Sequence, residues 1–308
     1  MKKALLLLAF LLCHLASFAQ SQKFTTLTYF QNDTLKLELD LFLPAKPGNG
    51  KLPLVLFEHG GGFSGGDRKS GHGFCSYLAD KGYAAATITY TLFAKNKNFG
   101  CNGQLAEKIK AFQHAANGLW LATAYFLKNT EKYNLDPAAI FVSGSSAGAE
   151  AALHAAFWDY KRMNLYPQVS LPANFRYKGV ISGAGALMDL NLITPENKIP
   201  VLLFHGSADT TVPYGTAAHH SCPTNSSNWF MLFGSLSIYQ HLVHLHGNTR
   251  LITYCGGTHA YSGELFGKNQ QVLVKFLDDV MAGSKTQEHV IVSTGKKGDR
   301  PNAYSFCE

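Results

Sequence analysis

The sequence is poor in charge for its length, and its basic residues are not grouped into a surface. Charged residues make up 15% of the 308 positions, and the formal net charge at pH 7 is +7. Basic residues are scattered except near the C-terminus, at Lys296, Lys297 and Arg300. A nucleic-acid surface needs a clustered basic patch or a stripe of basic and aromatic residues. We therefore expect no nucleic-acid partner, and the 46% of hydrophobic residues is typical of a globular protein.

Spacings that hold metal ions are also missing. The sequence has no CxxC pair and no HExxH motif, and the pair His241 and His244 lacks the glutamate of that motif. Zinc sites are commonly built from such spacings. We therefore predict that the protein needs neither a metal ion nor another cofactor.

Cysteines are few, and one of the six, Cys13, lies in the apolar N-terminal stretch. The other five are Cys75, Cys101, Cys222, Cys255 and Cys307. Outside the cytoplasm disulfides become possible, and an odd count leaves at least one thiol free or paired with another chain. We predict the pairs Cys75–Cys101 and Cys222–Cys255, although sequence alone does not fix the connectivity.

The N-terminus has the pattern of an export signal. Lys2 and Lys3 precede an apolar stretch from Ala4 to Leu12, and small residues follow as far as Ala19. This pattern predicts a signal peptide over residues 1–19. The stretch is short for a hydrocarbon core of roughly 30 Å, and Leu12 stands before Cys13 where a lipid-modified cysteine would need a small residue. We expect a secreted or periplasmic protein without a membrane anchor.

Two kinds of apolar pattern predict the sheet. Leu35 to Leu41 alternates leucines with charged residues and follows the turn pair Asn32-Asp33, so it predicts an antiparallel hairpin with Phe24 to Phe30 at a sheet edge. Short continuous apolar runs, typical of strands buried on both faces, follow at 54–57, 84–89, 140–142, 179–181, 201–204 and 251–254.

Helical segments alternate with these runs. Helical composition or spacing covers 71–81, 106–129, 147–158, 234–246 and 270–281. This alternation predicts an α/β fold with a mostly parallel sheet covered on both faces. Residues 160–176 and 214–233 fit neither pattern and are candidate loops or small caps over a pocket, and 290–292 is a candidate edge strand in a polar tail.

The pentapeptide Gly144-Ser145-Ser146-Ala147-Gly148 fits G-x-S-x-G and lies between an apolar run and a small-residue helix. A sharp strand-to-helix turn of this kind exposes the serine oxygen above a sheet, and glycines on both sides avoid crowding the turn. The alternative is an inert Gly/Ser loop. The flanking strand and helix favour Ser146 as a nucleophile.

A glycine run, His59-Gly60-Gly61-Gly62-Phe63, follows the apolar run at 54–57. Glycines there let backbone N–H groups approach a substrate carbonyl oxygen. A flexible turn or a phosphate cradle is the alternative, but the spacing fits neither G-x-G-x-x-G nor the P-loop. We assign His59 a structural role.

Two further loops supply an acid and a base. Asp209 follows the run at 201–204, and His259 follows the run at 251–254. A histidine so placed can accept the serine proton, and the aspartate can orient it. With 13 histidines in the chain, one near a strand end means little alone, and we expect His219 and His220 to be loop-surface residues. Glu150 is either a buried structural carboxylate or a neighbour of the pocket.

The order Ser146, Asp209, His259, each after its own strand, matches the α/β-hydrolase succession. Over Phe24 to Met281 the chain resembles the α/β-hydrolase superfamily, in particular its carboxylesterase and carbohydrate-esterase branch with an HGGGF oxyanion motif. The resemblance implies Ser146 as nucleophile, His259 as general base and acid, and Asp209 as its partner. It also implies an oxyanion hole formed by the N–H groups of Gly61, Gly62 and Ala147.

The resulting prediction is a secreted serine carboxylesterase that acts through an acyl-enzyme. Its domains would be a signal peptide at 1–19, an α/β-hydrolase catalytic domain at 20–283 and a C-terminal extension at 284–308. Candidate substrates are acetyl or feruloyl esters of plant polysaccharides and short-chain aliphatic esters. A peptidase or amidase of the same fold, or a non-catalytic binding module, are the alternatives, and no pattern indicates an oligomeric state.

Overall fold

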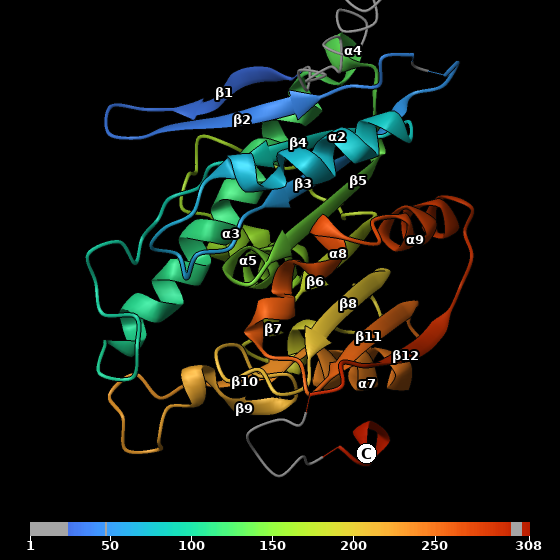
Figure 1. The fold of residues 1–308 in the computed structure, drawn as a ribbon. Coiled ribbons are helices and arrows are strands. Elements are labelled where there is room, and N and C mark those ends of the chain that lie inside the picture. The colour runs from blue at the N-terminus through green and yellow to red at the C-terminus, as the bar shows by residue number, and fades with distance from the viewer. Residues whose placement is uncertain (1–23, 47, 297–303) are drawn as a thin grey trace, which may run out of the picture.

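A twisted nine-stranded sheet forms the centre of the computed structural model, which describes residues 24–46, 48–296 and 304–308 (Figure 1). The strand order is β1-β2-β4-β3-β5-β6-β8-β11-β12. The strands are β1 Thr25–Gln31, β2 Lys36–Phe42, β3 Leu52–Glu58, β4 Ala84–Ile88, β5 Leu135–Ser145, β6 Gly179–Gly183, β8 Val201–Gly206, β11 Thr249–Cys255 and β12 Gln287–Ser293.

The predicted N-terminal hairpin is confirmed at one edge of this sheet. β1 pairs with β2 in antiparallel register, and β2 pairs antiparallel with β4. Asn32 closes the turn, because its side-chain oxygen accepts hydrogen bonds from the N–H groups of Thr34 and Leu35. The leucines of the alternating stretch point into the core at Leu37, Leu39 and Leu41.

The remaining pairings are all parallel, as the continuous apolar runs predicted. Each of the six runs lies largely within a strand. The edge strand expected at 290–292 is also confirmed, as part of β12, which pairs in parallel with β11. The polar tail therefore completes the sheet at the edge opposite the hairpin.

Helices cover both faces of the sheet (Figure 1). One face carries α2 His72–Asp80, α8 Glu264–Gly267 and α9 Gln271–Met281, and the other carries α3 Leu105–Lys128, α5 Ala147–Phe157 and α7 Ser235–His244. The five predicted helices are confirmed. Short helices are α4 Thr130–Tyr133 and α6 Tyr160–Met163, and 3-10 turns are η1 Arg68–Gly71, η2 Leu190–Leu192, η3 His219–Ser221, η4 His259–Gly263 and η5 Ser305–Cys307.

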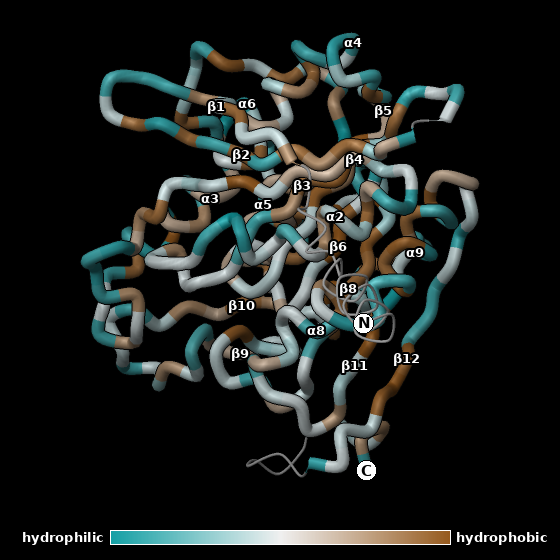
Figure 2. The backbone as a smooth tube through the Cα atoms, turned by 45° about the horizontal axis from the view of Figure 1, so that its top comes forward, coloured by the Kyte–Doolittle hydropathy of each residue, from teal (hydrophilic) through white to brown (hydrophobic). Residues whose placement is uncertain are grey.

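The hydrophobic core lies in two layers, one between each helical layer and the sheet. Figure 2 shows hydrophobic colour along central strands such as β4 and β8, and hydrophilic colour over many outer loops. Ala84 to Ile88 and Val201 to Phe204 are fully buried. Burial on both faces explains why these strands are continuously apolar.

A second, three-stranded sheet was not predicted. It contains β7 Ala186–Leu187, β10 Met231–Gly234 and β9 Thr216–Ala218, in that antiparallel order. Two of its strands lie in or at the end of the segment 214–233, which we expected to be a loop or cap. The strands have two to four residues each, which is too short for a periodic pattern to be read.

The predicted disulfide pairs are wrong. The structure joins Cys101 to Cys222 and Cys255 to Cys307, with Cα–Cα distances of 5.3 Å in both pairs. Cys75 forms no disulfide with any cysteine of the described segments, because it lies on the buried face of α2 against the sheet. Cys101 precedes α3, which covers the other face.

Within the described segments, no helix is long and apolar enough to cross a membrane. The predicted signal peptide at 1–19 lies outside these segments.

Candidate active site

The carboxyl ends of four parallel strands meet at one pocket. Loops after β3, β5 and β11 bring Gly60–Gly62, Ser146 and His259 to its walls, and Asp209 follows β8 directly behind His259. The pocket has a volume of about 420 Å³. Ligands of open α/β sheets bind at this end of the strands.

Ser146 lies between β5 and α5, as the strand-turn-helix pattern predicted. Its backbone has φ 55° and ψ −123°, and its N–H donates to the carbonyl of Gly183 at 2.8 Å. This conformation is rare for a residue with a side chain and marks a locally strained turn. It places the hydroxyl at the pocket surface, as in the sharp turn expected for a nucleophilic serine.

Close packing explains the two glycines of the pentapeptide. A Cβ atom on Gly144 would lie 2.2 Å from the carbonyl oxygen of Gly148, and a Cβ on Gly148 would lie 2.0 Å from the carbonyl oxygen of Glu58. Real Cβ atoms do not approach backbone atoms so closely. Only glycine therefore lets α5 begin directly against β3 and β5.

A continuous hydrogen-bond chain joins the three residues predicted to act together. Ser146 Oγ lies 2.7 Å from His259 Nε2, and His259 Nδ1 lies 2.6 Å from Asp209 Oδ2. The carboxylate accepts from Nδ1, which leaves Nε2 free to accept from the serine hydroxyl. The three strand-end loops thus meet in the arrangement that deprotonates a serine.

The side chain of Asp209 is fully buried and accepts hydrogen bonds from several donors besides His259. Its Oδ1 accepts from the N–H groups of Thr211 and Val212 at 2.8 and 3.1 Å, and its Oδ2 accepts from His205 Nε2 at 3.0 Å. Burial raises the pKa of Asp209, but the hydrogen bonds from His205 and His259 outweigh burial and bring the pKa well below its usual value. The carboxylate is therefore ionised wherever the protein is folded at neutral pH.

His205 is a functional neighbour that the sequence analysis missed. Its Nε2 donates to Asp209, so its Nδ1 accepts from the hydroxyl of Ser235 at 2.9 Å. The only sequence signal is that His205 stands four residues before Asp209 at the end of β8. The predicted apolar run ended at Phe204, so His205 was taken as part of the following loop and was assigned no role.

The glycine run lies beside Ser146, and its three glycines line the same pocket as His259. Gly61 has φ +121° and Gly62 has φ +60°, and a Cβ on Gly60 would lie 3.1 Å from the Cβ of Ser146. The carbonyl oxygen of Gly61 accepts from Ser64 and Gly65 at 3.1 Å, which closes a tight turn. Gly61 and Gly62 line the pocket, and so does Ala147, whose N–H opens α5 and has no partner within that helix.

The predicted structural role of His59 agrees with its surroundings. The ring is buried, its Nδ1 donates to the carbonyl of Gly60 at 2.7 Å, and it packs against Tyr90 with ring centroids 4.7 Å apart. It holds the start of the glycine turn and does not line the pocket.

The far wall of the pocket corrects one sequence prediction. Phe99, Glu150, His219 and His220 line it. We expected His219 and His220 on a loop surface, but His219 is only 1% exposed. The turn at η3 folds inward because the segment is tied down by the Cys101–Cys222 disulfide. Glu150 is both buried and a neighbour of the pocket.

Within the described segments, no group of three or more His, Cys, Asp or Glu side chains is arranged so that it could hold a metal ion. The arrangement can carry out acyl transfer, because a serine, a histidine and a carboxylate joined by hydrogen bonds converge on a pocket that the glycine run also lines.

The sheet, its helical layers and these strand-end loops are those of an α/β-hydrolase. The chain belongs to the BD-FAE family, whose model matches residues 39–198, a little over half of the 308 residues. This range includes the glycine run and Ser146 and ends before Asp209.

Two comparisons extend this finding. Fumonisin B1 esterase of Sphingopyxis macrogoltabida is 30% identical over 127 residues, which make up 37% of this chain and only 22% of the relative. The structure is also similar to that of Thermogutta terrifontis esterase 2, at 17% identity. The alignment with the paraoxon-phosphorylated form has a TM-score of 0.62 and covers 85% of this chain and 95% of the other. With the apo form the TM-score is also 0.62, covering 85% and 96%. At this identity the structural likeness establishes the fold.

Proposed function

We propose that the protein is a serine carboxylesterase in which Ser146, His259 and Asp209 form the catalytic triad. The observation that carries the proposal is the unbroken hydrogen-bond chain from Ser146 Oγ through His259 to the buried Asp209 carboxylate. Membership in the BD-FAE family and the likeness to proteins named esterases support it.

The reaction follows from the positions of these groups. Ser146 Oγ attacks the ester carbonyl while its proton passes to His259 Nε2, and Asp209 stabilises the resulting imidazolium. The oxyanion accepts hydrogen bonds from the N–H groups of Gly61, Gly62 and Ala147. His259 then protonates the departing alcohol, which leaves an acyl group on Ser146. A water molecule deprotonated by His259 releases the acid and restores the serine.

Candidate substrates are acetyl and feruloyl esters of plant polysaccharides and short-chain aliphatic esters. The pocket of about 420 Å³ suits a compact acyl group. The relative's name assigns it fumonisin B1 as substrate, which favours ester hydrolysis as the reaction of the matched segment.

The test is release of p-nitrophenol from acetate, butyrate and longer-chain esters by the protein and its Ser146→Ala variant. We expect the variant to lose at least about a thousandfold in kcat. Ser145→Ala is the matched control, because the hydrogen bond to His259 comes from Ser146. Acetylated and feruloylated xylan are the next substrates. Equal activity of wild type and Ser146→Ala would contradict the proposal.

We also propose that the chain is exported, with a signal peptide at 1–19, a catalytic domain at 20–283 and a C-terminal extension at 284–308. The two disulfides are consistent with an oxidising compartment. Expression of the full chain followed by N-terminal sequencing of the secreted or periplasmic product should give Gln20 as the first residue. A cytoplasmic product that begins at Met1 would contradict export.

A further inference from the structure

A buried carboxyl group lines the pocket, and one of its oxygens has no hydrogen-bond partner among the described residues. Glu150 lies on α5, one turn after Ser146, and its side chain is almost completely buried. Its Oε1 forms no hydrogen bond with any atom of the described segments, yet Glu150 is one of the residues that line the pocket. A buried polar atom without a partner is costly, so it points to a ligand group that completes it.

A second polar group lies beside it. His219 Nε2 is 3.5 Å from Glu150 Oε1, and His219 Nδ1 also has no hydrogen-bond partner in the described segments. His219 is 1% exposed and lines the same pocket. Two buried side chains, one from α5 and one from η3, therefore line the same pocket, and each has a polar atom without a partner in the described part of the chain.

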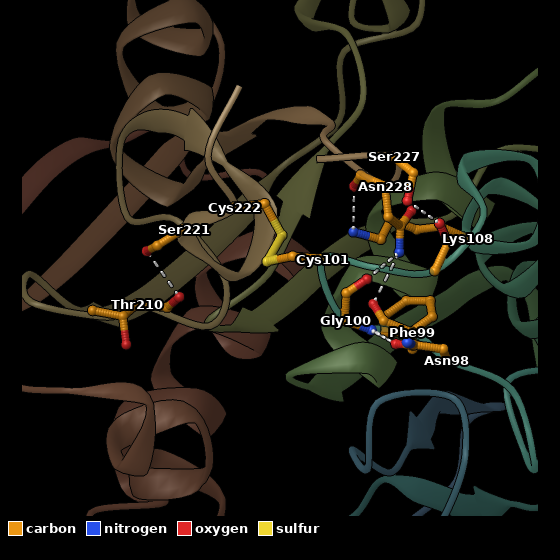
Figure 3. Close-up of a disulfide and its surroundings, with 11 residues drawn as sticks. Asn98, Phe99, Gly100, Cys101, Lys108, Thr210, Ser221, Cys222, Ser227 and Asn228 are labelled. Atoms are coloured by element: carbon orange, nitrogen blue, oxygen red, sulfur yellow. Dashed lines mark hydrogen bonds between the residues drawn. A yellow bond between two sulfur atoms is a disulfide. The ribbon is translucent and has the colours of Figure 1, made fainter. Parts of the chain in front are cut away.

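The wall that carries His219 is fixed in place. Figure 3 shows the Cys101–Cys222 disulfide between the loop of Phe99 and the segment that follows His219. In the same view the Asn228 amide donates to the carbonyls of Phe99 and Gly100 at 3.2 and 2.7 Å. Lys108 Nζ donates to the carbonyl of Asn228 at 3.1 Å. A wall held by so many contacts keeps its polar atoms at fixed positions, as a specific binding site requires.

Lys108 Nζ is held by the Asn228 carbonyl, and the groups that line the pocket themselves favour an uncharged ligand group. Burial raises the pKa of the Glu150 carboxyl well above its usual value, and burial lowers the pKa of His219. Burial together with the nearby Lys108 lowers the pKa of His220 to about 4. A protonated carboxyl and neutral imidazoles offer both hydrogen-bond donors and acceptors. A hydroxyl group, which both donates and accepts, matches such a set.

We propose that Glu150 and His219 form a subsite that binds a hydroxyl group of the ester substrate, next to the ester carbonyl at Ser146. The subsite rests on the proposed esterase function and narrows its substrate class to esters of hydroxylated acids or alcohols. Glu150 and His219 are specificity-determining residues in this account, and the triad performs the chemistry.

The test uses esters that differ by one hydroxyl group. Ethyl butyrate is compared with ethyl 3-hydroxybutyrate, which places a hydroxyl on the acyl side, and with 2-hydroxyethyl butyrate, which places one on the alcohol side. Monoethyl succinate tests an anionic group instead. The wild-type kcat/KM for at least one hydroxylated ester should exceed that for ethyl butyrate by about tenfold, since a hydrogen bond to a buried group contributes roughly this factor.

Variants assign the preference to the two residues. Glu150→Leu and His219→Phe should bring the ratio of kcat/KM values close to one, whereas Glu150→Gln, whose amide still donates and accepts, should retain most of it. Glu131→Gln, an exposed glutamate on α4, is the matched control and should keep the wild-type ratio.

The outcomes separate the subsite from the esterase function. Three results would overturn the subsite and leave the esterase function standing. The wild type could hydrolyse all esters with a kcat/KM ratio near one, or it could prefer monoethyl succinate. The third result is an unchanged ratio in both Glu150→Leu and His219→Phe. Hydrolysis of none of the esters would contradict both. Because the wild-type ratio alone is decisive, the test does not depend on the folding of any variant.

Discussion

Asp209 shows how one buried side chain can serve both structure and chemistry. Its Oδ1 holds the turn after β8 through the N–H groups of Thr211 and Val212, and its Oδ2 binds His205 and His259. The backbone donors fix the carboxylate before any substrate binds. Its orientation toward His259 therefore requires no rearrangement during the reaction.

The Asp209→Asn variant should keep the fold and lose activity. The amide retains the shape of the side chain, but its NH₂ group cannot accept the proton of His259 Nδ1, so the imidazole adopts the wrong tautomer. We expect kcat to fall by about four orders of magnitude with little change in KM. Steady-state kinetics and circular dichroism check this, and a fall of less than tenfold in a folded variant would contradict the assigned role.

Glu58 carries a second buried carboxyl group, and its burial affects how the stability of the protein depends on pH. It ends β3, faces Gly118 of α3, and neither of its carboxyl oxygens has a hydrogen-bond partner in the described segments. Burial raises its pKa well above the usual 4.5. The folded protein therefore holds a proton that the unfolded chain releases above about pH 4.5, and stability falls as pH rises beyond that value.

The Glu58→Gln variant should become more stable than the wild type as pH rises. The glutamine needs no proton, so it avoids a cost of about 1.4 kcal/mol for each pH unit between the unfolded pKa and the raised pKa of the folded state. Thermal unfolding at pH 5 and pH 8 measures the effect as a Tm difference that grows in favour of the variant. The exposed Glu131→Gln serves as control, and an equal difference at both pH values would count against a raised pKa.

Sequence reasoning identified some residues of the site and not others. Ser146, Asp209 and His259 stood out because each follows an apolar strand and the three occur in a known order. His205 did not stand out, because it is a single polar residue at the end of a buried strand. His219 did not stand out, because its contact with Glu150 joins segments that are distant in the chain. A histidine carries no local pattern that separates a buried partner of Asp209 from a surface residue.

At the scale of elements, the turn between β5 and α5 is the most constrained part of the site. The carbonyl oxygen of Ser146 accepts from Ala149 and Glu150 N–H groups, so α5 begins immediately after the strained residue. Gly148 packs against the last residue of β3. This contact sets the distance between Ser146 and the glycine run that follows β3.

Gly148→Ala should therefore damage both stability and activity. The added Cβ would overlap the Glu58 carbonyl, so α5 must shift away from β3, which costs about 2 kcal/mol or more. The same shift separates Ser146 from the oxyanion N–H groups and lowers kcat. Urea unfolding and kinetics test this, with Gly73→Ala as control because a Cβ there meets no atom within 4 Å. Unchanged kcat in Gly148→Ala would show that the packing does not position Ser146.

Element prediction succeeded where burial imposed a pattern. Continuous apolar runs identified the parallel strands, and alternating leucines identified β2. The small sheet of β7, β9 and β10 was missed, because its strands are short and are set by tertiary contacts. The inward fold of η3 was missed for the same reason.

At the scale of the whole molecule, the two disulfides link segments that are far apart in sequence. Cys101 and Cys222 are 121 residues apart and join the loop before α3 to the segment after η3. Cys255 and Cys307 tie the C-terminal tail to the end of β11, close to the loop of His259. Such pairings depend on the three-dimensional course of the chain, which explains why the pairs predicted from the sequence were wrong.

Replacing both Cys101 and Cys222 with serine should lower stability and alter the pocket. Loss of a native disulfide costs roughly 2–5 kcal/mol, and the separation of 121 residues places the expected cost at the upper end of this range. Because His219 stands near Cys222 and the triad does not depend on the bond, KM for hydroxylated esters should rise more than kcat falls. Denaturant unfolding and kinetics check both effects. Cys75→Ala, which removes a buried thiol from α2, is the control and should reduce stability without changing KM. Equal KM values in the wild type, the double-serine variant and Cys75→Ala would contradict a role for the disulfide in substrate binding.

The central claim is that Ser146 is the nucleophile of an ester hydrolase. The most direct measurement is labelling with diethyl p-nitrophenyl phosphate followed by mass spectrometry of the peptide that contains Gly144 to Gly148. We expect one diethylphosphoryl group on Ser146 and loss of esterase activity in step with labelling. The label should be retained in Ser145→Ala and absent from this peptide in Ser146→Ala. Esterase activity that persists in Ser146→Ala, or a label on another residue that abolishes it, would contradict the claim.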